Sequence, residues 1–175
     1  MMRPGDKHES FSELAKALSL IPELPWVLHV VGDGEMQSEV HALFNHFPQE
    51  KIVWHGKQPH EGIVSLFQNG YLYVWPGCGE AYGLAYLEAQ SAGLPVVAYN
   101  TAGVPEVVEH QYSGLLVDEH DANAMAAAVT QLLTDTEEHQ RLAQNAKDHV
   151  LKKHSDKKAS DILNQILSQA IGTRR

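Results

Sequence analysis

The chain has 175 residues, 43% of them hydrophobic, which is sufficient for one folded domain with a sizeable core. Its 13 basic and 22 acidic residues give a net charge of −9, which argues against nucleic acid or an anionic membrane as a partner of the whole surface. The single cysteine, Cys78, excludes an internal disulfide and favours a cytoplasmic location. No apolar run approaches the roughly 18 residues of a transmembrane segment, and no secretory signal follows Met1.

Short apolar strands alternate with amphipathic helices along most of the chain. In chain order the pattern predicts a helix around 11–18, a strand at 26–31, a helix at about 36–47, a strand at 51–55, a helix around 63–67, a strand at 71–75, a helix at 83–93, and strands at 96–99 and 115–117. Apolar, β-branched strands separated by helices indicate a Rossmann-like parallel sheet with helices on both faces. In such α/β sheets, ligands bind beyond the carboxyl ends of the strands.

From Asp121 onward the pattern is helical only. Three helices are expected, the last from near Ser155 to Gly172, followed by a loose tail at 173–175. We therefore predict one domain over residues 1–172 that ends in several helices.

Two carboxylates, Glu80 and Glu88, flank the start of the helix predicted at 83–93. The residues Leu84, Leu87 and Ser91 fall on one stripe of this helix, and Glu88 projects about 40° from Leu84. This places Glu88 beside the buried face, where a carboxylate must accept hydrogen bonds.

The amino end of the same helix offers free backbone amides that suit a phosphate. Two carboxylates would repel a bare phosphate, but they suit a ligand with hydroxyls on both sides of its phosphates. A nucleoside diphosphate sugar has this chemistry.

Five motifs in order resemble the C-terminal, donor-binding half of the retaining GT-B glycosyltransferases, the glycosyl transferases group 1 or family 4. The likeness spans roughly residues 1–150. The motifs are Arg3-Pro4-Gly5-Asp6-Lys7, Val30-Val31-Gly32-Asp33-Gly34, Glu80 with Glu88, Gly93-Leu94-Pro95-Val96-Val97-Ala98, and Ala102-Gly103-Val104-Pro105-Glu106-Val107-Val108.

The resemblance assigns roles to individual residues. As catalytic residues it implies Glu80, which would bind hydroxyls of the transferred sugar, and Arg3 and Lys7, which would bind the donor diphosphate. The implied substrate-binding residues are Glu88 at the ribose, the amides of Ala81, Tyr82, Gly83 and Leu84 at the phosphates, the loop of Gly32 and Gly34 near the nucleotide, and Lys57 at the base or ribose.

Each assignment has a structural alternative. Glu80 could cap the following helix, and Glu88 could be a solvated helix edge. Arg3 and Lys7 could be ordinary charged residues near the chain terminus, and Lys57 could be a solvated charge. Gly32 and Gly34 could form a plain turn. The eleven histidines have no metal-ligand spacing, so no metal site is expected. The resemblance likewise implies metal-independent chemistry, with the nucleoside diphosphate sugar as donor substrate and no cofactor.

The function that the resemblance implies is transfer of a hexose, with retention, from a UDP- or GDP-hexose to a hydroxyl acceptor. The N-terminal acceptor domain of such enzymes is absent from this chain, so the isolated domain is not expected to be active. A peripheral association of the full-length protein with the inner membrane is compatible with the sequence. The alternatives are a noncatalytic nucleotide-sugar-binding module or partner subunit, and a sugar-nucleotide epimerase or phosphorylase-like enzyme on the same architecture.

Overall fold

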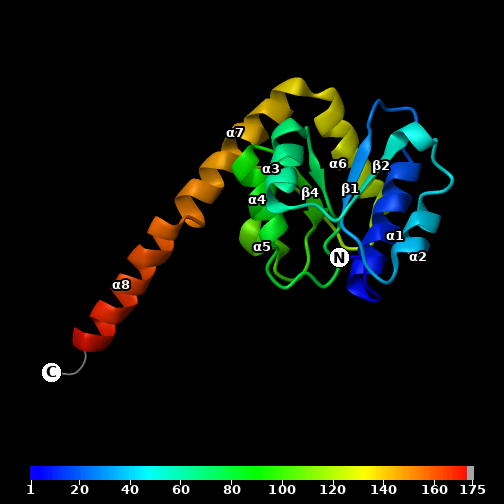
Figure 1. The fold of residues 1–175 in the computed structure, drawn as a ribbon. Coiled ribbons are helices and arrows are strands. Elements are labelled where there is room, and N and C mark those ends of the chain that lie inside the picture. Colours follow the sequence, from blue (N-terminus) through cyan, green and yellow to red (C-terminus); the bar gives the residue numbers. More distant parts are fainter. Residues whose placement is uncertain (173–175) are drawn as a thin grey trace.

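Parallel strands form two small sheets at the centre of the molecule (Figure 1). The computed structural model describes residues 1–172. One sheet pairs β1 (Leu28–Val31) with β2 (Ile52–Gly56). The other has the order β3 (Tyr73–Val74), β4 (Val96–Tyr99) and β5 (Gly114–Val117). All of these pairs are parallel, as the sequence predicts.

Helices connect the strands and close the chain in the predicted order. They are α1 (Asp6–Ser19), α2 (Gln37–Leu43), a 3-10 turn (Gln49–Lys51), α3 (His60–Asn69), α4 (Leu84–Ala92), α5 (Val104–Val107), α6 (Ala122–Thr134), α7 (Thr136–Lys153) and α8 (Asp156–Gly172). The predicted tail at 173–175 lies outside the described residues.

Strand β4 shows how helices cover both faces of the larger sheet. Its four residues are fully buried. Val96 and Ala98 pack in a cluster with side chains of α4 and α5, whereas Val97 and Tyr99 pack in a second cluster with side chains of α1, α6 and α7. This alternation follows from the two-residue period of a strand, and it confirms the predicted fold class.

The strands form two separate sheets, one of β1 and β2 and one of β3, β4 and β5, which differs from the single sheet expected from the sequence. Side-chain packing on α1, rather than a hydrogen-bonded ladder, joins the two parts. The ring of Trp75, just after β3, lies edge-on against Phe11 of α1 with centroids 4.8 Å apart. Trp75 thereby joins the apolar cluster that covers β1 and β2.

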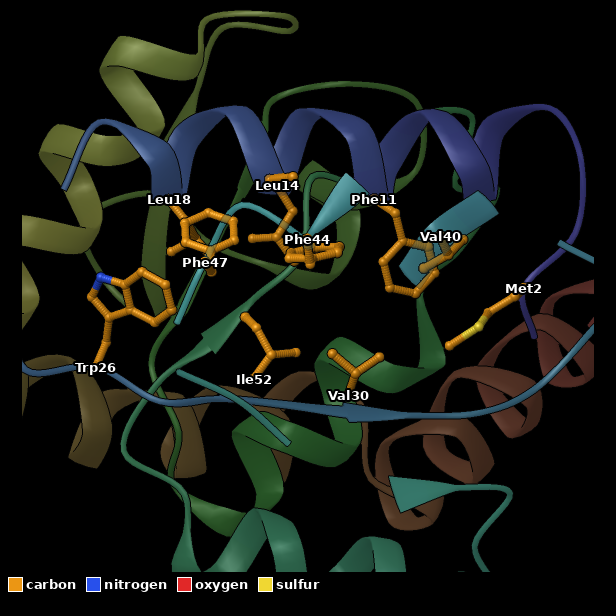
Figure 2. Packing of buried hydrophobic residues seen from close by; sticks show 11 residues of the cluster. Met2, Phe11, Leu14, Leu18, Trp26, Val30, Val40, Phe44, Phe47 and Ile52 are labelled. Atoms are coloured by element: carbon orange, nitrogen blue, oxygen red, sulfur yellow. The ribbon is translucent and has the colours of Figure 1, made fainter. Parts of the chain in front are cut away.

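The buried face of α1 covers one side of this cluster (Figure 2). Phe11, Leu14 and Leu18, which have the helical spacing read from the sequence, point toward Val30 and Ile52 of the smaller sheet. Because α1 packs on both sheets, the first turn of this helix has a fixed position relative to the ends of the strands.

Helices α6 and α7 begin at aspartate caps. The Asp121 carboxylate accepts a hydrogen bond from the Ala124 amide at 2.8 Å, and that of Asp135 accepts one from the Glu138 amide at 3.0 Å. Helix α8 extends away from the body of the molecule (Figure 1). Within residues 1–172, no helix is both long and apolar enough to cross a membrane.

Candidate functional site

The first turn of α1 contacts the loop after β3 through two of the predicted catalytic residues. Helix α1 begins after Gly5, whose φ of 77° lies in the left-handed region, and this turn places Lys7 in the first helical turn. The Lys7 ammonium donates to Oε2 of Glu80 at 2.5 Å. It also lies 5.6 Å from the ring centroid of Trp75. The structure thus brings a cation and a carboxylate from distant segments to one place.

Free backbone amides follow Glu80 directly. Within residues 1–172, the amides of Ala81, Tyr82, Gly83 and Leu84 donate to no protein acceptor. The side chain of Glu80 does not cap α4, so the alternative that Glu80 serves as a helix cap is wrong. The positive end of the helix therefore faces solvent beside the Lys7–Glu80 pair, a suitable place for an anion.

Two glycines shape the loop that carries these amides. Gly83 has a φ of 90°, and a Cβ there would lie 2.5 Å from the Tyr86 ring. The amide of Gly103 donates to the Glu80 carbonyl at 2.9 Å, and a Cβ on Gly103 would lie 2.1 Å from the Ala81 carbonyl oxygen. Packing within the protein is thus sufficient to explain both glycines, and Gly103 supports the loop from the side of α5.

The position predicted for Glu88 beside the buried face of α4 is wrong. Leu84 is 66% exposed, and the buried side of the helix consists of Tyr86, Ala89 and Gln90. The physical reason is hydrogen bonding. The Tyr86 hydroxyl donates to the Trp75 carbonyl at 3.1 Å, and the Gln90 amide donates to the Val107 carbonyl at 2.8 Å. Because the Tyr86 hydroxyl and the Gln90 amide nitrogen are hydrogen-bonded, Tyr86 and Gln90 can occupy the core.

Glu88 instead lies on the exposed side of α4. It borders a hollow of about 280 Å³ between α3 and α4, together with His60, Phe67 and Ser91. Burial raises the pKa of the Tyr73 hydroxyl, and the charges of Glu80 and Glu88 raise it further. Both carboxylates are therefore within electrostatic reach of one hydroxyl on β3. A larger hollow of about 620 Å³ lies elsewhere, between β5, α6 and α7.

The glycine loop after β1 lies against the start of the chain. The Met2 amide donates to the Asp33 carbonyl at 2.7 Å, and the Met36 amide donates to the Met2 carbonyl at 3.1 Å. Gly34 leaves no room for a side chain, since a Cβ there would lie 2.1 Å from the Met2 carbonyl oxygen. The loop of Gly32 and Gly34 thus holds the segment that leads to Arg3, which is exposed and forms no ion pair in the described part of the chain.

Lys57 and Cys78 take no part in the Lys7–Glu80 ion pair. Lys57 is exposed after β2 and forms no ion pair within residues 1–172. The Cys78 thiol is buried, and burial raises its pKa, which argues against a nucleophilic role. No group of three or more potential metal-binding side chains gathers among residues 1–172.

Sequence reasoning missed two residues that contact this site. Trp75 flanks Lys7, and Ser10 of α1 accepts a hydrogen bond from the Cys78 amide in the loop that carries Glu80. Ser10 occupies the buried face of α1 next to Phe11, and a small polar residue at such a position is a signal that the sequence does contain.

Comparison with protein families defines the class of this protein. Residues 4–149 match the family described as glycosyl transferases group 1, and the chain belongs to that family. A relative, D-inositol 3-phosphate glycosyltransferase of Corynebacterium urealyticum, is 40% identical over 92 residues, which are 53% of this chain and 22% of that protein.

Solved structures share the fold at low identity. Sucrose-phosphate synthase from Thermosynechococcus elongatus superposes with a TM-score of 0.81 at 24% identity, over 96% of this chain and 44% of that one. Anabaena HepE in complex with UDP-glucose superposes with a TM-score of 0.78 at 22% identity, over 98% of this chain and 46% of that one. The resemblance to the C-terminal domain of GT-B glycosyltransferases is confirmed. The chain spans less than half the length of these relatives.

Proposed function

We propose that this chain is the donor-binding domain of a retaining hexosyltransferase. It binds a nucleoside diphosphate hexose, and the complete enzyme transfers the hexose to a hydroxyl acceptor. The observation that carries the proposal is the contact between Lys7 and Glu80 beside the unpaired amides that begin at Ala81. The Lys7 cation suits the diphosphate, and the Glu80 carboxylate suits the hydroxyls of the sugar. The unpaired amides suit the phosphate oxygens.

The chemistry of glycosyl transfer explains why these groups belong together. When the bond from the anomeric carbon to the phosphate oxygen breaks, negative charge develops on the departing diphosphate. Fixed cations and backbone dipoles stabilise such charge most effectively when they are already in place. In this proposal Lys7, Arg3 and the amino end of α4 bind the diphosphate, without a metal ion.

The two carboxylates take the two sugars of the donor. Glu80 accepts hydrogen bonds from hydroxyls of the transferred hexose, and Glu88, on the second turn of α4, accepts them from the ribose. The configuration at the anomeric carbon is retained if the acceptor hydroxyl attacks this carbon from the same face from which the diphosphate departs. The hydroxyl then gives its proton to the leaving phosphate. No residue of this chain then acts as a nucleophile.

Isothermal titration of the chain with UDP, GDP, ADP and their hexose conjugates, with and without magnesium, tests the proposal. We expect one nucleotide to bind without magnesium, and Glu88→Gln to weaken its binding about ten-fold, the scale of one hydrogen bond to a charged group. Glu137→Gln, on the exposed face of α7, is the matched control and leaves affinity unchanged. Equal affinities for all three proteins would contradict the role of Glu88, and binding only with magnesium would contradict the metal-independent site.

A further inference from the structure

We infer that Ser10 is a positioning residue, which fixes the loop carrying Glu80 against the first turn of α1 and so sets the geometry between Lys7 and Glu80. The inference rests on the proposed function for its link to the donor. Its structural part, the fixing of the loop, is independent of any ligand.

The hydroxyl of Ser10 joins two backbone segments. Ser10 is fully buried. Its Oγ donates to the carbonyl of Asp6 at 2.8 Å, one helical turn earlier, and accepts from the amide of Cys78 at 3.0 Å. In the described part of the chain, this hydroxyl is the acceptor of the buried Cys78 amide. Its loss would leave that amide unpaired away from water.

The two segments that Ser10 joins are those that carry the paired charges. Asp6 directly precedes Lys7, and Cys78 lies two residues before Glu80. The segments approach so closely that a Cβ on Gly79 would lie 2.3 Å from the Asp6 carboxylate. One buried hydroxyl thus sets the distance between the backbones from which both charged side chains extend.

The ion pair is less suited to set this distance. The Lys7 and Glu80 side chains are 25% and 22% exposed, and ion pairs that water reaches contribute little to structure. Lys7 also has a long, flexible side chain. The fixed point is therefore the buried hydrogen bond, and the charged side chains remain free to bind a ligand.

A second buried hydrogen bond of α1 provides a matched control. The Tyr99 hydroxyl donates to Oε2 of Glu13 at 2.9 Å, and both residues are buried. This hydrogen bond joins α1 to β4 and uses neither the Ser10 hydroxyl nor the Cys78 amide, while the Tyr99 ring packs in the same buried cluster as Cys78. Tyr99→Phe therefore removes a comparable hydrogen bond from the same helix but leaves the loop attached.

Amide hydrogen exchange and nucleotide titration of the 175-residue chain test the inference on Ser10→Ala, Ser10→Thr and Tyr99→Phe. In Ser10→Ala we expect exchange at Cys78 and Glu80 to rise at least ten-fold relative to core amides of β4, since the loop opens without global unfolding. UDP affinity, or that of whichever of GDP and ADP binds best, should fall on the order of ten-fold. Ser10→Thr retains the hydroxyl and should restore both values, while Tyr99→Phe should change neither.

Three results would overturn the inference. These are unchanged exchange at Cys78 in Ser10→Ala, full nucleotide affinity despite faster exchange, and equal loss of affinity in Tyr99→Phe. If the alanine variant does not fold, Ser10→Cys takes its place, because a thiol is a weak acceptor. A wild-type chain that binds no nucleotide would contradict the proposed donor site, and the exchange rates would then decide on Ser10 separately.

Discussion

Lys7 and Glu80 lie 73 residues apart in the chain and form an ion pair with 2.5 Å between Nζ and Oε2. In the proposed donor site these two groups bind different parts of the ligand, so the free domain keeps the cation and the carboxylate paired with each other. A donor diphosphate must then compete with Glu80 for Lys7. The exchange is inexpensive because both side chains are partly exposed.

Replacement of Lys7 by methionine should separate binding from stability. Methionine keeps the apolar length of the side chain next to Trp75 but removes the charge. We expect the free energy of unfolding to change by less than about 1 kcal/mol, as for a partly exposed ion pair. Affinity for the nucleoside diphosphate should fall at least ten-fold, because the charge-assisted contact with phosphate is lost. Urea unfolding and calorimetric titration measure the two effects.

Glu80→Gln provides the complementary change. Glutamine keeps the shape of the side chain but releases Lys7, so affinity for a bare nucleoside diphosphate should be retained or increase. The nucleoside diphosphate hexose should no longer bind more tightly than the bare diphosphate, because the contact of the carboxylate with the hexose hydroxyls is lost. Loss of both affinities to the same extent would show that Glu80 holds the loop rather than the sugar.

Gly34→Ala should loosen the start of the chain. The φ of Gly34 is 151°, and the added Cβ would lie 2.1 Å from the Met2 carbonyl oxygen, so the segment before α1 must move. We expect a loss of about 2 kcal/mol or more in the free energy of unfolding, measured by urea denaturation. Gly5→Ala is the control. Its φ of 77° is also strained, but nothing lies within 4 Å of the new Cβ, so a loss of about 1 kcal/mol is expected. Equal losses would mean that contact with Met2 contributes nothing.

Local patterns in the sequence predicted most of the fold. The four buried residues of β4 form an apolar run that begins with two β-branched valines and is bounded by Pro95 and Asn100, and the element appears where predicted. Helix α4 ends at Gly93, which adopts the left-handed conformation that glycine favours. These features depend on residues next to one another in the chain.

Long-range contacts were harder to predict. The periodicity of α4 did not identify its buried face, because Tyr86 and Gln90 enter the core with hydrogen bonds to Trp75 and Val107, which lie on other elements. The role of Ser10 likewise depends on a loop 68 residues away. The pairing of Lys7 with Glu80 is consistent with the family resemblance, but composition and spacing alone do not indicate it.

The corrected face of α4 can be tested by a pair of substitutions. Leu84→Gln changes an exposed side chain and should alter the free energy of unfolding by less than about 0.5 kcal/mol. Tyr86→Phe should cost about 1 kcal/mol or more, since the Trp75 carbonyl loses the hydroxyl donor that the buried Tyr86 provides. The reverse order in thermal or urea denaturation would contradict the buried face described here.

Two histidines near the end of α7 should make the free energy of unfolding depend on pH. His149 is 3% exposed, and neither ring nitrogen has a hydrogen-bond partner in the described chain. Its Nδ1 lies 3.4 Å from Oε2 of Glu109, which accepts a hydrogen bond from Lys153, and the ring of His154 lies 5.1 Å away. Burial lowers the pKa of His149, and the charges of His154 and Lys153 lower it further, against a smaller opposite effect of Glu109.

The sign of the pH effect follows from this lowered pKa. Below about pH 6.5 an unfolded chain protonates His149 while the folded protein does not, so the free energy of unfolding decreases as the pH falls. The slope for one such group is at most about 1.4 kcal/mol per pH unit, and it ends below the folded pKa. We expect His149→Phe, which keeps a buried ring but cannot titrate, to flatten the curve between pH 7 and 5. Urea unfolding across pH 5 to 8.5 measures this, with parallel wild-type and variant curves expected above pH 7.5. An unchanged slope in the variant would mean that His149 is already protonated in the folded protein or is not buried as described.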